Sequence, residues 1–101
     1  MKLVRDGIPR IIEESGRTCE YYIADDEEYR ARLYEKMHEE LNEFIENPSY
    51  EEAADIWEVL RALCLEHALC MEVVENVAMD KRETTGGFYD KIILEKVNES
   101  R

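Results

Sequence analysis

The sequence predicts an all-α fold: a helical bundle with two antiparallel helices that bear acidic residues, and short extended arms at the N- and C-terminal ends. Two long stretches repeat apolar residues at helical spacing, and only Asn47-Pro48-Ser49 separates them. Both ends of the chain carry apolar residues without that spacing. At 101 residues the chain is expected to form a single domain, residues 1–101, with a modest core.

The amino-terminal part is expected to run from an extended segment into a short helix. Residues 1–7 form the extended segment, and Pro9 suits the first turn of the helix because a missing N–H costs nothing there. Ser15-Gly16 is predicted to end this helix. Residues 17–24 are rich in tyrosine and β-like, but the patch is too short to build a sheet alone.

The first long helix is predicted to begin after Asp25 or Asp26, because acidic side chains suit the positive end of a helix. Its apolar residues recur every three or four positions and mark one face: Tyr29, Leu33, Met37, Leu41 and Phe44. The Asn47-Pro48-Ser49 turn ends this helix and starts the second. The predicted buried face of the second helix consists of Ile56, Val59, Leu60 and Leu63.

A third helical run is predicted from Met71 to about Glu83, and Gly86-Gly87 is a strong stop signal after it. Lys81 and Arg82 suit the C-terminal end of that helix, where they complement its dipole; they are also candidates for phosphate binding. Residues 88–97 are expected to form a short strand or a docked arm, which could pair with the extended amino terminus.

Two acid pairs flank the central turn. Glu40 and Glu43 stand three residues apart on the first long helix, and Glu52 and Asp55 do so on the second. Residues three apart share a helix face, so antiparallel packing is expected to aim four carboxylates into one volume. Their mutual repulsion requires a cation, and an all-oxygen set suits a hard ion such as Mg2+, with Mn2+ as an alternative. Glu39 falls nearly on the opposite side of its helix and reaches at most the edge of such a site.

The same acids have an interpretation without metal. Ser49-Tyr50-Glu51-Glu52 matches a capping box, in which the Glu52 carboxylate reaches back to the N–H of the capping residue. Glu40 and Glu43 also fit a solvated face on a helix that is acidic nearly everywhere. The argument for a metal therefore rests on the conjunction of two pairs across a short turn.

The charge balance restricts the partners. The chain has 13 basic and 25 acidic residues and a net charge of -12, so it repels nucleic-acid polymers and anionic membranes. A free nucleotide that arrives with its metal remains compatible. Cys19, Cys64 and Cys70 form an odd set with no CxxC spacing and no secretory signal precedes them, so a cytoplasmic protein with reduced thiols is expected. No apolar run approaches the roughly 20 residues of a membrane span.

Three stretches match a known pattern. Glu39-Glu40-x-x-Glu43 followed by Glu52-x-x-Asp55 resembles the EExxE…ExxD signature of the MazG-like all-alpha nucleoside triphosphate pyrophosphohydrolase superfamily. The segments Lys2 to Pro9 and Lys81 to Phe88 resemble the opening and closing segments of a small house-cleaning branch of that superfamily. The resemblance spans essentially the whole chain. It departs in the short interval between Glu43 and Glu52, and in Gly7, where a lysine is expected.

The resemblance implies hydrolysis of a nucleoside triphosphate, ordinary or damaged, to the monophosphate and pyrophosphate. It implies Mg2+ bound by four acids: Glu40, Glu43, Glu52 and Asp55. Glu39 would assist as a ligand or as a base for water, beside Glu40 in the catalytic role. The phosphates would be bound by basic residues: Lys81, Arg82, Arg5 and Lys2. It also implies an α-helical homodimer or larger homo-oligomer.

A hypothesis from a different class is a non-catalytic acidic module for oligomerisation or partner binding. In that case the acids are caps and solvated faces, and the apolar helices serve assembly. Stabilisation by a divalent metal that depends on Glu52 distinguishes the enzyme from the module.

Overall fold

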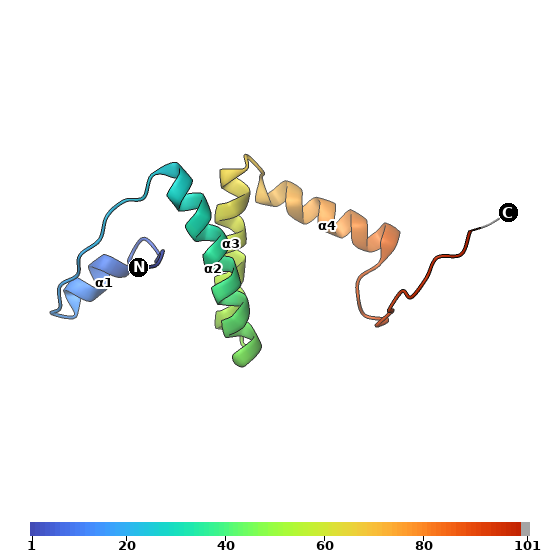
Figure 1. Cartoon of the computed structure of the whole chain (residues 1–101), viewed down its shortest axis with the longest axis horizontal. Helices are drawn as coiled ribbons and strands as arrows, with labels where there is room; N and C mark the ends of the chain where they lie inside the picture. The colour runs from blue at the N-terminus through green and yellow to red at the C-terminus, as the bar shows by residue number, and fades with distance from the viewer. Residues whose placement is uncertain (100–101) are drawn as a thin grey trace. The chain divides into compact units, whose positions relative to one another are not determined.

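The computed structural model describes residues 1–99, and their regular structure is entirely helical. The helices are α1 (Ile8–Glu14), α2 (Asp26–Glu46), α3 (Tyr50–Glu66) and α4 (Met71–Thr85) (Figure 1). No β-strand occurs in residues 1–99. The predicted all-α fold class is therefore confirmed.

The chain forms two compact units. The first, Met1–Leu69, contains α1, α2 and α3, and the second begins at Cys70 and contains α4. Within the first unit α2 and α3 pack side by side and run antiparallel, joined by the short turn at residues 47–49 (Figure 1). This pair is the predicted pair of acid-bearing helices. None of the helices in residues 1–99 is both long and apolar enough to cross a bilayer.

Local signals set the helix boundaries. The Asp25 side chain accepts a hydrogen bond from the Glu28 N–H at 2.8 Å, which caps α2 at the predicted position. The Ser49 hydroxyl accepts from the Glu52 N–H at 3.2 Å and caps α3. At the end of α4, Gly86 has φ +84°, a conformation that L side chains rarely adopt. The predicted starts and stops of these helices are confirmed.

The core of the first unit lies along the seam between α2 and α3. Leu33 of α2 packs with Val59 and Leu63 of α3, and Leu33 is only 2% exposed. Partly buried side chains extend this core: Leu3, Tyr29, Met37 and Ala62. Leu3 comes from the extended amino terminus, so that segment packs against both helices and belongs to the fold of this unit.

The buried faces are narrower than predicted. Leu41 and Leu60 were expected on the apolar faces of their helices, but they are 47% and 36% exposed. Because α2 and α3 bury one seam against each other, apolar residues off that seam stay in contact with solvent.

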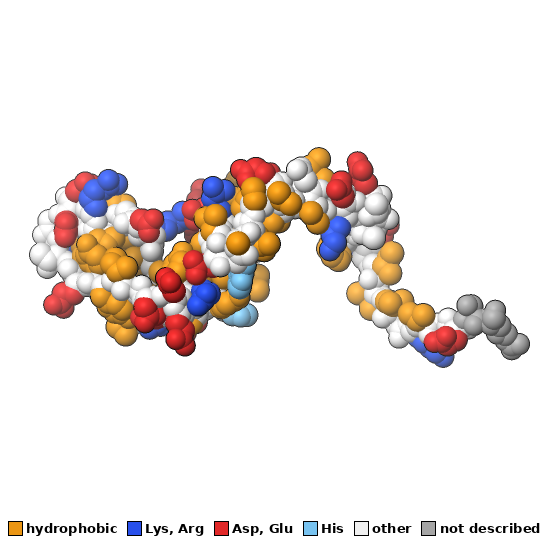
Figure 2. All heavy atoms as spheres, turned by 90° about the horizontal axis from the view of Figure 1, so that it is seen from above, with side chains coloured by type: hydrophobic (Ala, Val, Ile, Leu, Met, Phe, Trp, Pro, Cys, Tyr) orange, Lys and Arg blue, Asp and Glu red, His pale blue; other side chains and the backbone are white. Residues whose placement is uncertain are grey.

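Residues 88–97, predicted to form a short strand or a docked arm, form no strand, so the strand alternative is wrong within one copy of the chain. A strand needs a neighbouring strand to pair its backbone N–H and C=O groups, and no segment of residues 1–99 is a strand. Apolar side chains of this tail are exposed, as the row of orange spheres beyond α4 shows (Figure 2). The tyrosine-rich residues 17–24 likewise form coil.

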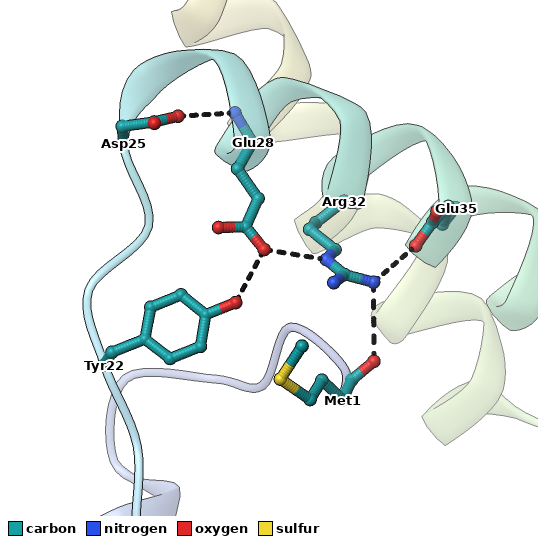
Figure 3. A network of polar contacts seen from close by, with 6 residues as sticks. All are labelled: Met1, Tyr22, Asp25, Glu28, Arg32 and Glu35. Atoms are coloured by element: carbon teal, nitrogen blue, oxygen red, sulfur yellow. Dashed lines mark hydrogen bonds and ion pairs between the residues drawn. The ribbon is translucent and has the colours of Figure 1, made fainter.

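A polar network fastens the amino terminus and the coil before α2 to that helix. Arg32 donates to the carboxylates of Glu28 and Glu35 at 3.3 and 3.2 Å and to the Met1 carbonyl at 3.5 Å (Figure 3). The Tyr22 hydroxyl donates to the same Glu28 carboxylate at 2.7 Å. Residues 1–7 are thereby held over the helix pair, which positions Arg5 for the site described next.

Candidate metal centre

The turn between α2 and α3 brings acids of both helices to one place. Glu40 lies near the C-terminal end of α2, and Glu52 and Asp55 lie in the first two turns of α3. The Ser49 cap fixes the start of α3 and therefore the direction in which Glu52 points. Antiparallel packing then sets these three acids facing one another across the helix seam.

Oxygen atoms of Glu40, Glu52 and Asp55 all lie within 4.8 Å of one another. Glu40 is buried, with 8% of its surface exposed, and the other two are half-buried. Two oxygens on one Mg2+ ion lie at most about 4.2 Å apart, so the group is close to the spacing that a shared ion requires. A buried carboxylate without a cation is costly.

Glu40 has a basic partner on its own helix. The Lys36 ammonium lies 3.3 Å from the Glu40 carboxylate, one helical turn away, and 3.4 Å from that of Glu39. Its side chain is only 17% exposed. Lys36 therefore supplies the positive charge that permits Glu40 to be buried.

Asp55 has a basic partner from the amino terminus. The Arg5 guanidinium donates to the Asp55 carboxylate at 2.5 Å, across 50 positions of sequence. This hydrogen bond is the main reason why the pKa of Arg5 is raised above its ordinary value, and the charges of Glu58 and Glu40 add to it. The amino terminus thus contributes a cation directly beside the acids.

Glu52 has neither a hydrogen bond nor an ion pair from its carboxylate within residues 1–99. Its pKa is raised, first because burial penalises the charged form and then because of the nearby charges of Glu43, Asp55 and Glu40. Only the serine half of the predicted capping box forms, since the Ser49 hydroxyl accepts from the Glu52 N–H. The Glu52 carboxylate joins the acids instead, which is where a metal ion would relieve the repulsion.

The remaining predicted residues differ in their positions. Glu43 is exposed and lies outside the group of three, although its charge still acts on Glu52. Glu39 lies beside the site, where Lys36 and Lys2 contact it, the latter at 3.8 Å. Lys81 and Arg82 belong to α4 of the second unit, and their role in phosphate binding stays a prediction.

Lys36 is the site residue that the sequence analysis missed. Its signal was present: Lys36 precedes Glu39 by three positions and Glu40 by four, so all three share a helix face. It also follows Leu33 by three positions, which places it next to the buried seam. A lysine at the edge of the apolar face of a helix, one turn before an acid, indicates an ion-pair partner for that acid when it is buried.

Comparisons of the chain with protein-family models, with characterised proteins and with solved structures find no match in any of the three. The geometry of the first unit and the resemblance of three short stretches are therefore what bears on function.

Proposed function

We propose that this protein is a metal-dependent hydrolase that converts a nucleoside triphosphate, ordinary or damaged, into the monophosphate and pyrophosphate. One observation carries the proposal: Glu40, Glu52 and Asp55 converge from two helices, with oxygens within 4.8 Å of one another. The unpartnered Glu52 carboxylate makes this group an acceptor for a further cation.

The donor set fits Mg2+, with Mn2+ as an alternative. All three groups are carboxylates, the hard oxygen ligands that these ions prefer, and Mg2+ typically takes only a few protein carboxylates together with water and substrate phosphates. When bound, the ion neutralises phosphate charge and polarises the phosphoryl oxygens. Glu43, whose charge reaches Glu52, is the candidate for a fourth ligand.

The residues around the acids bind the phosphates and position the attacking water in the proposal. Arg5, beside Asp55, and Lys2, beside Glu39, bind phosphate oxygens in the proposal and stabilise the charge that develops on pyrophosphate. Lys81 and Arg82 are further candidates by resemblance. Glu39 orients a water molecule and accepts its proton. The water oxygen bonds to phosphorus, the P–O bond between the α and β phosphates breaks, and pyrophosphate leaves.

The test is pyrophosphate release from a panel of ordinary and modified nucleoside triphosphates with Mg2+ and with Mn2+. Glu40→Gln and Asp55→Asn keep the side-chain shape and remove the charge, and Glu51→Gln is the matched control on the exposed face of α3. Substituting residues that only support metal ligands lowers affinity or activity about 10- to 100-fold, so loss of a ligand should exceed that range. Release that persists in both folded variants would place the chemistry elsewhere.

A second candidate is supported by the exposed apolar surface. Leu41 and Ile45 of α2 are 47% and 65% exposed, and Trp57 of α3 is 47% exposed. Leu41 and Ile45 stand four positions apart and share one face of α2, and large exposed apolar surface marks interaction sites. The alternative function is therefore a non-catalytic acidic oligomerisation or partner-binding module. It predicts no release from any substrate and no metal-dependent change in melting temperature.

The same surface supports assembly of the enzyme itself. We propose a homodimer or larger homo-oligomer whose copies cover the apolar residues beside the α2–α3 seam. The net charge of -12 argues against a nucleic-acid polymer or an anionic membrane as the partner. Three free cysteines, Cys19, Cys64 and Cys70, agree with the proposed cytoplasmic location.

A further inference from the structure

Residues 88–97, which follow α4, expose nearly all of their apolar surface. Phe88 and Tyr89 are 98% and 80% exposed. Four aliphatic residues further along are between 75% and 84% exposed: Ile92, Ile93, Leu94 and Val97. Within residues 1–99, no hydrogen bond or ion pair involves residues 92–97. We call residues 88–97 the C-terminal segment. Its apolar side chains and most of its backbone are free to contact a partner.

The C-terminal segment is neutral, although the whole chain has a net charge of -12. Its charged residues are two acids, Asp90 and Glu95, and two bases, Lys91 and Lys96. The rest of the chain therefore carries all of the net charge and repels a second copy. Two copies can approach each other at the C-terminal segment without that repulsion.

The order of the charges is complementary to itself when the segment is reversed. Consider two antiparallel copies with Ile93 of one opposite Ile93 of the other. Asp90 then lies opposite Lys96 and Lys91 lies opposite Glu95, and the symmetry makes each pair occur twice. Apolar residues also lie opposite one another: Ile92 with Leu94, and Tyr89 with Val97. Opposite charges, and an aromatic residue facing a β-branched one, stabilise a pair of strands.

Other alignments of the two segments lose these charge pairs. An antiparallel shift by one residue places Asp90 opposite Glu95 in one direction, and Lys91 opposite Lys96 in the other. A shift by two residues leaves every charge of the segment opposite an uncharged residue. A parallel, in-register alignment places each charge opposite the same charge. Because like charges directly opposite each other are destabilising, the charges favour the antiparallel alignment centred on Ile93.

We infer that the C-terminal segments of two copies pair as antiparallel strands, with a two-fold axis at Ile93. A strand needs a neighbouring strand for its backbone N–H and C=O groups, and the second copy supplies the one that a single chain lacks. In one copy, Tyr89 and Asp90 form a turn and Lys91 has φ +61°. Pairing extends these residues, which removes Lys91 from a left-handed conformation that is unfavourable for it.

This pairing adds a contact to the proposed homo-oligomer and does not depend on the proposed catalysis. The C-terminal segment belongs to the second unit, whereas Glu40, Glu52 and Asp55 belong to the first. A ribbon of two strands is only marginally stable by itself. The pairing is therefore best detected by a reaction that traps it.

The experiment traps the pairing as a disulfide between copies, in a protein that carries Cys19→Ser and Cys70→Ser; Cys64 is buried and is retained. Residues directly opposite each other in antiparallel strands have Cα atoms within disulfide range, so Ile93→Cys should cross-link to its own counterpart. Ile92→Cys is the matched control, because its counterpart lies on the diagonal, too far for a disulfide. We expect Ile93→Cys to cross-link more than about tenfold faster, because paired thiols react at a high effective concentration.

A mixture of two single variants tests the register independently. Residue 89 of one copy lies opposite residue 97 of the other, so Tyr89→Cys and Val97→Cys should cross-link with each other. Neither should cross-link with itself, because the two copies of residue 89 are separated by eight residues, about 27 Å along the strands.

Charge reversal tests the ion pairs. Asp90→Lys turns two attractive pairs into repulsive ones and should slow the cross-linking of Ile93→Cys about tenfold. Adding Lys96→Asp to the same chain restores opposite charges and should restore the rate. Asp80→Lys, at an exposed position of α4, makes the same change in net charge and should leave the rate unchanged.

Equal cross-linking of Ile92→Cys and Ile93→Cys, which parallel stacking or random collision gives, would overturn the inference. So would the absence of cross-links between copies, which is the result if the C-terminal segment docks on its own chain, or a failure of Lys96→Asp to restore the rate. Failure of the proposed function would look different, since the Ile93→Cys protein would cross-link while the natural protein released no pyrophosphate from any triphosphate.

Discussion

At the scale of residues, the candidate site combines acidic side chains with basic side chains that partly neutralise them. Arg5 and Lys36 neutralise Asp55 and Glu40, while Glu52 has no cation of its own. The two basic side chains therefore stand beside the acids that a metal ion would bind. In the proposal, an ion bound at Asp55 competes with Arg5 for that carboxylate, and a displaced guanidinium is available for phosphate.

Because Arg5 competes with the metal ion and also contacts phosphate in the proposal, removing Arg5 should strengthen metal binding and weaken substrate binding. Arg5→Met should tighten binding of Mg2+ about two- to fivefold, the worth of one solvent-accessible ion pair, and should raise KM for the triphosphate. Metal affinity is measured by calorimetry without nucleotide.

Arg10→Met is the matched control, because Arg10 forms an exposed pair with Glu14 inside α1, away from the acids. Unchanged or weaker metal binding in Arg5→Met would contradict the role of Arg5 as a competing cation.

Tyr29 is partly buried against the core between α2 and α3. Its titration should make the stability of the protein depend on pH in the alkaline range. Its pKa is raised above 10.0, first by burial and then by the charges of Glu66 and Asp6. A raised folded-state pKa stabilises the protein fully below the unfolded value, and that contribution is lost as pH rises through the folded value. The free energy of unfolding should therefore fall above pH 10 by more in the natural protein than in Tyr29→Phe.

Urea titrations on both sides of pH 10 measure the difference, with Tyr50→Phe as the control because Tyr50 is 93% exposed. Parallel loss of stability in the natural protein and Tyr29→Phe would show that Tyr29 titrates as an exposed tyrosine does.

At the scale of elements, the start of α3 connects helix capping to the metal centre. Ser49 caps the helix whose first two turns carry Glu52 and Asp55. The stability of that turn therefore determines how well the two acids are held in place.

Ser49→Ala should lower the free energy of unfolding by about 1 kcal/mol, the usual value of an N-cap, and lower Tm by about 4–8 °C for a domain of this size. It should also weaken Mg2+ binding, because the first turn of α3 frays. Differential scanning calorimetry with and without Mg2+ measures both effects. Ser49→Asp, which retains a capping oxygen, should restore both the Tm and the Mg2+ affinity. A Ser49→Ala protein that melts at a lower temperature but binds Mg2+ normally would show that the cap does not support the metal site.

At the scale of the whole molecule, more large apolar residues are exposed than buried within residues 1–99. Only a few apolar residues in the described part of the chain are buried: Leu33, Val59, Leu63, Cys64 and Met71. Large apolar residues on α2 and α3 and along the tail are exposed. Burial of apolar area is the main stabilising term of folding, so assembly of copies is the expected source of further burial.

The proposed homo-oligomer predicts a specific response to charge. Ile45→Glu places a carboxylate on exposed apolar surface of α2 and should shift the protein to monomer in sedimentation experiments, with a lower Tm at equal concentration. Asn42→Glu adds the same charge at an exposed polar position and should leave the assembly unchanged. A natural protein that sediments as a monomer at all concentrations would contradict the assembly.

Much of the secondary structure follows from neighbouring residues. Asp25 and Ser49 cap α2 and α3, Pro9 lies in the first turn of α1, and Gly86 ends α4, each at the predicted place. These signals are short-range, because a cap or a stop depends on hydrogen bonds within a few positions. The acid pairs were visible for the same reason: a spacing of three is a property of one helix.

The amino-acid sequence by itself determined the all-α fold, the antiparallel pair around residues 47–49 and the acids that the pair presents. Only the tertiary structure decided which acids meet: Glu40, Glu52 and Asp55 converge, while Glu43 stays exposed. It alone joined Arg5 to Asp55 and closed a pocket with residues 3–6. The physical reason is that helix spacing fixes which side chains share a face, whereas the packing of separate segments fixes which faces meet.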